Sequence, residues 1–189
     1  MRLVLATRND HKVREVQQLL APWGVDPLPE HVVLPPEDGE TFAENALGKA
    51  RAAAAALGRP AIADDSGVEA EALGGRPGVR SARFAGEDAT DEENLAKLLR
   101  EAPAGTGLRY VCALAYVDPE AGTEHVVEAT CTGRVAAHPR GDGGFGYDPA
   151  FEPDDVPDGR TMAELSPEEK DAISHRGRAV AALRAWLAG

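Results

Sequence analysis

The chain has little positive charge to balance its acidic residues. Its 189 residues include 32 Asp and Glu but only 20 Lys and Arg, which gives a formal net charge of −12. Proteins that bind nucleic acid polymers need a basic surface for phosphate contacts, so this class is excluded as a general activity. One small anion is still compatible with the composition, because a few cations gathered in a cleft outweigh distant negative charge.

Long apolar runs and cysteines are also scarce. No segment approaches the roughly 18 apolar residues that a membrane-spanning helix needs, and the apolar run at residues 3–6 is too short for a signal peptide. We therefore expect a cytoplasmic protein without a membrane partner. Cys112 and Cys131 are the only cysteines, which favours two buried free thiols over a disulfide or a metal site.

Hydrophobic residues make up 43% of the chain, enough for a sizeable core and for two lobes around one cleft. Apolar spacing and capping residues predict alternating elements: a strand at 2–6, helices at 12–20 and 41–57, a helix from Thr90, a hairpin of strands 108–117 and 124–135, and helices from Ser166 and Ser174. The loop-like segment 138–157 is too long to be only a connection. The expected class is α/β, with a mixed sheet flanked by helices in a single domain over residues 1–189.

Two neighbouring acids, Asp64 and Asp65, follow a short apolar run at 61–63. Gly58 and Pro60 precede this run, so we expect a buried strand that ends in a turn at 64–67. Adjacent carboxylates repel each other and are costly to desolvate, which favours a site for Mg²⁺. The alternative is that Asp-Asp-Ser-Gly forms a solvated turn.

The polar segment 7–12 lies between the first strand and the first helix. Free backbone amides and the positive end of a helix favour an anion such as a triphosphate there, and Thr7, Asn9 and Lys12 add donors. In the alternative interpretation, Asn9 or Asp10 only caps the helix and Lys12 lies on the surface. The segment is not a Walker loop, because it lacks the required glycines and the Gly-Lys-Ser/Thr ending.

Further charged residues are candidates for nucleotide or metal contacts. Glu37 belongs to an acidic turn, and Lys49 lies on the helix that follows. Near the C-terminus, Lys170, His175 and Arg176 bring cations together. Each of these residues also has a simpler interpretation, as a solvated loop or as helix-surface charge.

Segment 144–149, Gly-Phe-Gly-Tyr-Asp-Pro, has an aromatic ring between two glycines. The glycines leave the ring of Phe145 open to a planar ligand, while Asp148 can hydrogen-bond the ligand edge. A nucleobase has both properties. The alternative is an aromatic side chain that anchors a long loop to the core.

Taken together, these segments resemble the family of inosine/xanthosine triphosphate pyrophosphatases, the hydrolases of noncanonical purine nucleotides. The matching blocks occur in order along nearly the whole chain, at residues 5–12, 41–46, 63–67, 73–83, 144–149 and 174–177. One position departs from the family pattern, since Arg8 stands where the family usually has glycine. Its guanidinium could add a phosphate contact.

The resemblance implies an elongated mixed sheet, two lobes enclosing a cleft, a homodimer, and an Mg²⁺-dependent hydrolase that converts ITP, dITP and XTP into the monophosphate and pyrophosphate. It implies that Glu37 and Asp65 hold the Mg²⁺ and that Asp65 is the catalytic residue, a general base for the attacking water. The implied substrate-binding residues are Thr7, Arg8, Asn9, Asp10, His11, Lys12, Lys49, Ser66, Phe145, Gly146, Tyr147, Asp148, Lys170, His175 and Arg176.

Selectivity would follow from the donors that face the base. His175 or Arg176 suits the 6-oxo group of hypoxanthine or xanthine, whereas adenine carries a 6-amino donor that would leave them unpaired. Two alternatives are open. A related pyrophosphatase for pyrimidine triphosphates would share the reaction but not the base-binding blocks, and a nucleotide sensor without catalysis would not need Glu37, Asp65 and Lys12.

Overall fold

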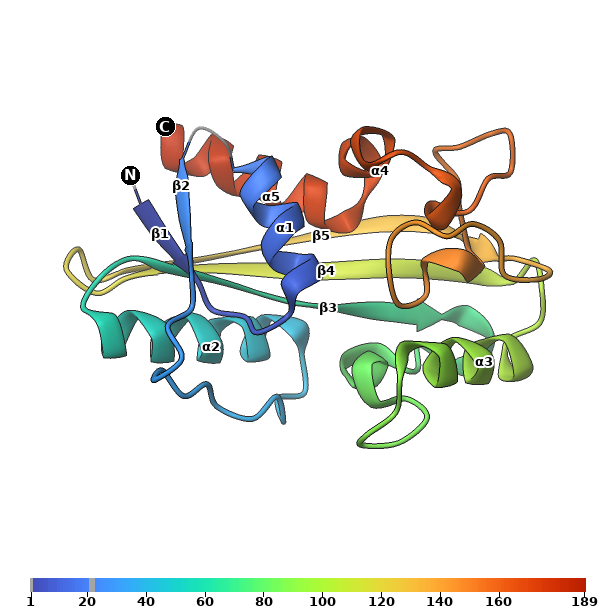
Figure 1. The fold of residues 1–189 in the computed structure, drawn as a ribbon, viewed down its shortest axis with the longest axis horizontal. Coiled ribbons are helices and arrows are strands. Elements are labelled where there is room, and N and C mark those ends of the chain that lie inside the picture. The colour runs from blue at the N-terminus through green and yellow to red at the C-terminus, as the bar shows by residue number, and fades with distance from the viewer. Residues whose placement is uncertain (1, 21–22) are drawn as a thin grey trace. The chain divides into compact units, whose positions relative to one another are not determined.

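The computed structural model describes residues 2–20 and 23–189, and its strands form a mixed sheet (Figure 1). The strands are β1 (Arg2–Leu5), β2 (Gly24–Pro27), β3 (Ala61–Ala70), β4 (Gly107–Asp118), β5 (Thr123–Val135) and β6 (Phe151–Pro153), in the order β2-β1-β3-β4-β5-β6. β1 pairs in parallel with β2 and β3, with Leu3 opposite Val25, whereas β5 and β6 are antiparallel. The predicted mixed sheet and α/β class are confirmed.

The helices predicted from capping boxes begin where expected, whereas α1 begins two residues before the predicted start at residue 12. The α-helices are α1 (Asp10–Leu19), α2 (Phe42–Leu57), α3 (Asp91–Glu101), α4 (Pro167–Ile173) and α5 (His175–Ala188). Capping boxes precede α2, α3 and α4, and Gly58, in the left-handed conformation with φ of 62°, ends α2. No helix within residues 2–20 and 23–189 is long and apolar enough to cross a membrane.

Two strands show what local sequence predicts and what it does not. Residues 119–122 link β4 to β5, its neighbour in the sheet, and such a short link requires an antiparallel hairpin, as predicted. Strand β2 was not predicted, because Gly24, Asp26 and Pro27 are poor strand formers. It exists through its pairing with β1.

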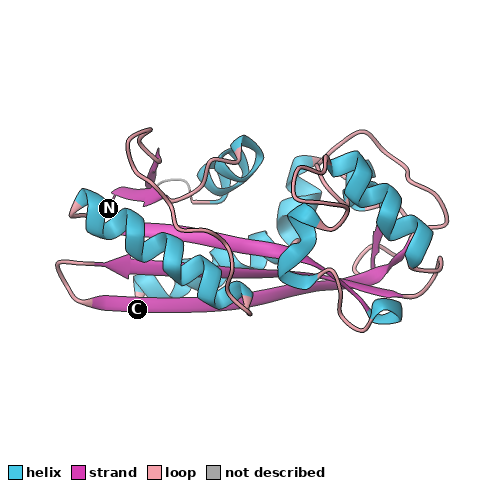
Figure 2. Ribbon diagram, turned by 90° about the horizontal axis from the view of Figure 1, so that it is seen from below, coloured by secondary structure: helices cyan, strands magenta, loops and turns pink. Residues whose placement is uncertain are grey.

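The chain separates into two compact units, each with its own apolar core. Unit 1 comprises Met1–Asp65, Cys112–Ala129 and Arg176–Gly189. Helices α1 and α5 cover one face of its strands and contribute core residues to it, such as Val16 and Leu183. Helix α2 covers the other face and lies in front of the strands in Figure 2.

Unit 2 comprises Ser66–Val111 and Thr130–His175. Its core joins residues of β3, β4 and β5 to Leu98 of α3 and Phe151 of β6. Strand β6 lies inside the segment 138–157, which confirms that this segment is more than a connection. Cys112 in unit 1 and Cys131 in unit 2 are both buried free thiols, as predicted. The predicted cleft between two lobes of a single domain stays a prediction.

Candidate active site

The acidic pair Asp64–Asp65 lies inside strand β3, which continues to Ala70. The predicted turn at 64–67 is therefore wrong. Successive side chains of a strand face opposite sides of the sheet, so the two carboxylates contact different helices. Residues of α1 and α5 contact Asp64, whereas residues of α2 contact Asp65. Buried carboxylates persist within a strand when such partners satisfy them.

Asp64 is completely buried among cations. Its Oδ2 lies 3.0 Å from Nζ of Lys12 and accepts hydrogen bonds from Arg176 Nη2 at 2.9 Å and Nε at 3.2 Å. The remaining guanidinium nitrogen of Arg176, Nη1, donates to Glu15 at 2.5 Å. Burial by itself would raise the pKa of Asp64, but Lys12, Arg176 and Lys49 outweigh it and hold this pKa well below its ordinary value.

Asp65 has weaker positive surroundings. Asn45 Nδ2 donates to its Oδ2 at 2.9 Å, and Lys49 Nζ lies 3.7 Å from Oδ1. Lys49 also pairs with the Glu37 carboxylate and donates to the carbonyl of Asp64 at 2.7 Å. Burial raises the pKa of Asp65, Lys49 opposes this rise, and the nearby charge of Glu37 adds to it. A carboxyl with a raised pKa is a better proton acceptor than its exposed counterpart.

In the segment before α1 the structure confirms the predicted helix cap, and the binding of phosphates there stays a prediction. Asn9 caps the helix, since its Oδ1 accepts from the amides of His11 and Lys12 at 2.9 and 3.2 Å. Thr7 Oγ1 accepts from the Asn9 amide at 3.2 Å, and the side chains of Asp10 and His11 are exposed. Lys12 does not lie on the surface: its side chain is 14% exposed and faces Asp64.

Arg8 contacts backbone carbonyls of the loop that follows β2. Its Nη1 donates to the Leu28 carbonyl at 3.3 Å, and its Nη2 lies 2.8 to 3.2 Å from the carbonyls of Pro29, Glu30 and Val32. The guanidinium thereby clamps segment 28–32 to the loop before α1. The phosphate contact of Arg8 stays a prediction.

In unit 2, Asp148 accepts several hydrogen bonds that fix the predicted base-binding segment 144–149. This buried carboxylate accepts from Tyr110 Oη at 2.8 Å, from Lys170 Nζ at 2.8 Å and from the Phe145 amide at 2.9 Å. Lys170 Nζ also lies 4.9 Å from the centre of the Phe145 ring, a cation–π arrangement. A carboxylate has about four acceptor positions, so three donors still leave one for a ligand.

Neighbouring residues hold this segment in place. Gly144 has φ of +68°, and a Cβ there would lie 2.0 Å from Asp148 Oδ2, so only glycine fits. Tyr147 is buried and donates to the Ser81 carbonyl at 2.7 Å, which anchors the loop, and Gly146 donates its amide to Asp91 at 3.1 Å. His175 stacks on Tyr110, with ring centres 4.4 Å apart. Ser66, the first residue of unit 2, is partly buried on β3.

The oxygen donors around Lys49 suit a hard divalent cation. Glu37 and Asp65 both approach the ammonium of Lys49, so two carboxylates converge on one point of unit 1. Among residues 2–20 and 23–189, no group of three or more His, Cys, Asp and Glu side chains is arranged to hold a metal ion. Mg²⁺ commonly takes one or two carboxylates and completes its shell with water and phosphate oxygens, so this donor set fits Mg²⁺.

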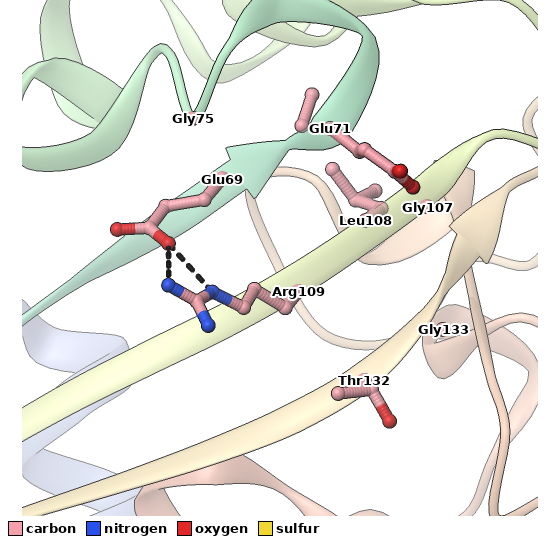
Figure 3. Close-up of a pocket in the computed structure, with 9 residues that line it drawn as sticks. Glu69, Glu71, Gly75, Gly107, Leu108, Arg109, Thr132 and Gly133 are labelled. Atoms are coloured by element: carbon pink, nitrogen blue, oxygen red, sulfur yellow. Dashed lines mark hydrogen bonds and ion pairs between the residues drawn. The ribbon is translucent and has the colours of Figure 1, made fainter.

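A pocket of about 360 Å³ on unit 2 is a separate feature (Figure 3). It lies over β3, β4 and β5, and Glu69 and Arg109 on its wall form an ion pair with a 2.6 Å contact. None of the predicted site residues lines it. Because the predicted residues lie elsewhere, the pocket is not the candidate active site.

Three contact residues were not predicted. Glu15 pairs with Arg176, Tyr110 donates to Asp148, and Asn45 donates to Asp65. A signal existed for Asn45, because asparagine is a poor residue inside an alanine-rich helix and usually has a specific partner there. Arg176 is occupied by Asp64 and Glu15, and its contact with a base stays a prediction.

The chain is similar to known proteins over nearly its full length. The model of the Ham1 family matches residues 3–186. A dITP/XTP pyrophosphatase from Geobacillus kaustophilus is 53% identical over 96% of this chain and 91% of its own length. The protein of that name from Shigella flexneri is 48% identical, over 95% and 94% of the two chains.

Solved structures of HAM1 proteins share the fold of this chain. A HAM1 protein from Coxiella burnetii aligns with a TM-score of 0.87 and 41% identity, over 100% of this chain and 98% of its own. The Ham1 protein of Staphylococcus aureus aligns with a TM-score of 0.87 and 40% identity, over 100% and 99%.

Proposed function

The chain belongs to the Ham1 family, and from this premise we propose that it hydrolyses noncanonical purine nucleoside triphosphates. ITP, dITP and XTP would be converted to the nucleoside monophosphate and pyrophosphate, which removes them from the nucleotide pool. Relatives about half identical over nearly the full chain are named dITP/XTP pyrophosphatases, and this supports the proposal.

One observation carries the proposal: two buried cations and one part-buried cation contact two successive carboxylates of β3. Lys12 and Arg176 face Asp64, and Lys49 faces Asp65. Asp64, Asp65, Glu37 and Glu15 balance these cations, so a polyphosphate would bind through the two lysines together with Mg²⁺. Lys12 and Lys49 are the residues that we assign to the phosphates.

Asp65 is the general base in this mechanism. Its carboxylate takes a proton from water, the water oxygen bonds to phosphorus, the bridging P–O bond breaks, and pyrophosphate or the monophosphate leaves with the electron pair. The raised pKa of Asp65 favours this proton transfer. Glu37 and Asp65 would hold Mg²⁺, which would neutralise negative charge on the phosphates. Asp64 keeps Lys12 and Arg176 in place.

Unit 2 supplies recognition of the purine. Phe145 offers an aromatic face, Lys170 and Asp148 lie beside it, and His175 is held by its stacking on Tyr110. A hydrogen-bond donor that faces the 6-position can bind the 6-oxo group of hypoxanthine and xanthine. It would be left unpaired by adenine, which has a 6-amino group. A homodimer and a cytoplasmic location complete the proposal.

A substrate panel tests the proposal. ITP, dITP, XTP, GTP, ATP, dTTP and UTP are incubated with the protein and Mg²⁺, and pyrophosphate and phosphate are quantified separately. We expect pyrophosphate from ITP, dITP and XTP and none without Mg²⁺. Preferential turnover of dTTP or UTP would point to a pyrimidine enzyme, and binding without turnover would point to a sensor. Hydrolysis in ¹⁸O-labelled water then shows which phosphorus is attacked.

A further inference from the structure

Asn45 joins the candidate general base to the acidic loop that carries Glu37. The side chain is 6% exposed on α2. Its Nδ2 donates to Asp65 Oδ2 at 2.9 Å, and its Oδ1 accepts from the Gly39 amide at 2.8 Å. A carboxylate only accepts and a backbone amide only donates, so both ends of the Asn45 amide are satisfied in one orientation.

The loop approaches Asn45 very closely at Gly39. A Cβ on Gly39 would lie 2.7 Å from Asn45 Oδ1 and 3.0 Å from Glu44 Cβ. Only glycine therefore allows this contact without displacing the loop. The acidic loop is packed against the first turn of α2 at a position two residues after Glu37.

Lys49 makes a parallel connection one helical turn further along α2. It contacts Glu37 in the loop and Asp65 on β3, as Asn45 contacts Gly39 and Asp65. The two connections differ in kind. An ammonium on a flexible stem acts as a point charge, whereas a planar amide fixes the direction of its partner. Asn45 occupies Oδ2 of Asp65, and Oδ1 is the oxygen that faces Lys49.

We infer that Asn45 is a positioning residue, which sets the rotation of the Asp65 carboxylate and holds the Glu37 loop on α2. This inference rests on the proposed function for its effect on turnover, but its effect on the loop is independent of it. Loss of a partner that orients a catalytic or metal-binding group typically lowers activity about 10- to 100-fold.

The chain offers a matched control in Asn94. This residue also follows a Thr and Glu capping box, lies at the same position of its helix, and is buried. Its Oδ1 accepts from the Ala85 amide at 2.8 Å, but its Nδ2 donates to a backbone carbonyl, that of Ala82, at 3.1 Å. Asn94 therefore connects a loop to a helix without contacting a candidate catalytic group.

Two pairs of variants separate the two contacts. Asn45→Ala removes both, whereas Asn45→Asp keeps the acceptor for the Gly39 amide and replaces the donor to Asp65 by a carboxylate oxygen, which repels it. Asn94→Ala and Asn94→Asp make the same changes at the control position. For each protein, kcat and KM for ITP with Mg²⁺ are measured, together with hydrogen exchange of residues 36–41 without nucleotide or metal, and the melting temperature.

We expect Asn45→Ala to lower kcat about 10- to 100-fold, with KM within about threefold of wild type, and to speed exchange at residues 36–41. Asn45→Asp should lower kcat similarly while exchange stays near wild type. Both Asn94 variants should keep kcat within about twofold. A kcat near wild type in both Asn45 variants, or an equal loss in the Asn94 variants, would overturn the inference.

Wild-type turnover of ITP separates failure of the proposed function from failure of this inference. If the wild type releases no pyrophosphate, the proposed function fails, and the exchange data still decide on Asn45. Unchanged exchange at residues 36–41 in Asn45→Ala would then overturn its positioning role, whereas faster exchange in Asn45→Ala alone would support it.

Discussion

Arg176 donates two hydrogen bonds to a single oxygen of Asp64, from Nη2 at 2.9 Å and from Nε at 3.2 Å. Both side chains are buried, and Glu15 and Lys12 continue the network on either side. Such a pair gives modest net stability compared with apolar residues, but removing one partner leaves a buried charge uncompensated.

Arg176→Met should therefore lower the free energy of unfolding by about 3–5 kcal/mol. Glu15→Gln is the matched control, because it keeps a hydrogen-bond acceptor for Arg176 and leaves the contact with Asp64 intact; it should cost about 1 kcal/mol. Urea unfolding followed by circular dichroism measures both. Equal losses in the two variants would mean that the contact with Asp64 is not the dominant one.

Asp64 should also make stability sensitive to acid. Its pKa in the folded chain lies below the value of about 3.9 for an unfolded Asp, so the unfolded state takes up a proton first as pH falls. The contribution of Asp64 is fully present well above that value, and it is lost progressively as pH falls from about 5 through the unfolded pKa. Urea unfolding from pH 6 to pH 3 should show a shallower decline for Asp64→Asn than for wild type. Identical slopes would contradict the depressed pKa.

Asp65→Asn tests the proposed general base. We expect ITP to bind nearly as in wild type, because the side chain keeps its shape, while kcat falls by roughly 10² or more. Equilibrium dialysis with labelled ITP gives binding, and pyrophosphate release gives turnover. A variant that still turns ITP over at close to the wild-type rate would remove Asp65 from this role.

Phe145→Leu should weaken binding of the purine. Stacking on an aromatic ring contributes about 0.5–1.5 kcal/mol, so KM for ITP should rise about 2- to 12-fold. Phe84→Leu is the control, since Phe84 also has a lysine, Lys97, over its ring at 4.4 Å but lies outside the candidate site. It should lower the melting temperature and leave KM unchanged. Parallel changes in KM would argue against Phe145 as the base platform.

Arg8→Gly tests the clamp on segment 28–32. Removing the guanidinium frees up to four carbonyls, so hydrogen exchange in this segment should rise and the free energy of unfolding should fall by about 1 kcal/mol. Arg8→Lys should restore only part of both, because an ammonium lacks the planar fork of donors. Exchange that is the same in wild type and Arg8→Gly would show that other contacts order the segment.

Much of the architecture was predictable because its causes are local. The Thr41 and Glu44 capping box predicts the start of α2, and the short link at 119–122 predicts an antiparallel pair. The blocks shared with the pyrophosphatase family could also be identified from the sequence, since they are runs of neighbouring residues. Strand β2 and the continuation of β3 through Asp64 and Asp65 were not, because they depend on partners from other parts of the chain.

The sequence by itself determined the fold class and the family, because local propensity and short motifs encode them. Only the tertiary structure decided which cation contacts which carboxylate. Because side chains alternate along β3, Asp64 contacts Lys12 and Arg176 on one face of the sheet. Asp65 contacts Asn45 and Lys49 on the other face. Those partners lie on three different helices, and their convergence follows from packing on two faces of a sheet, which no spacing along the chain specifies.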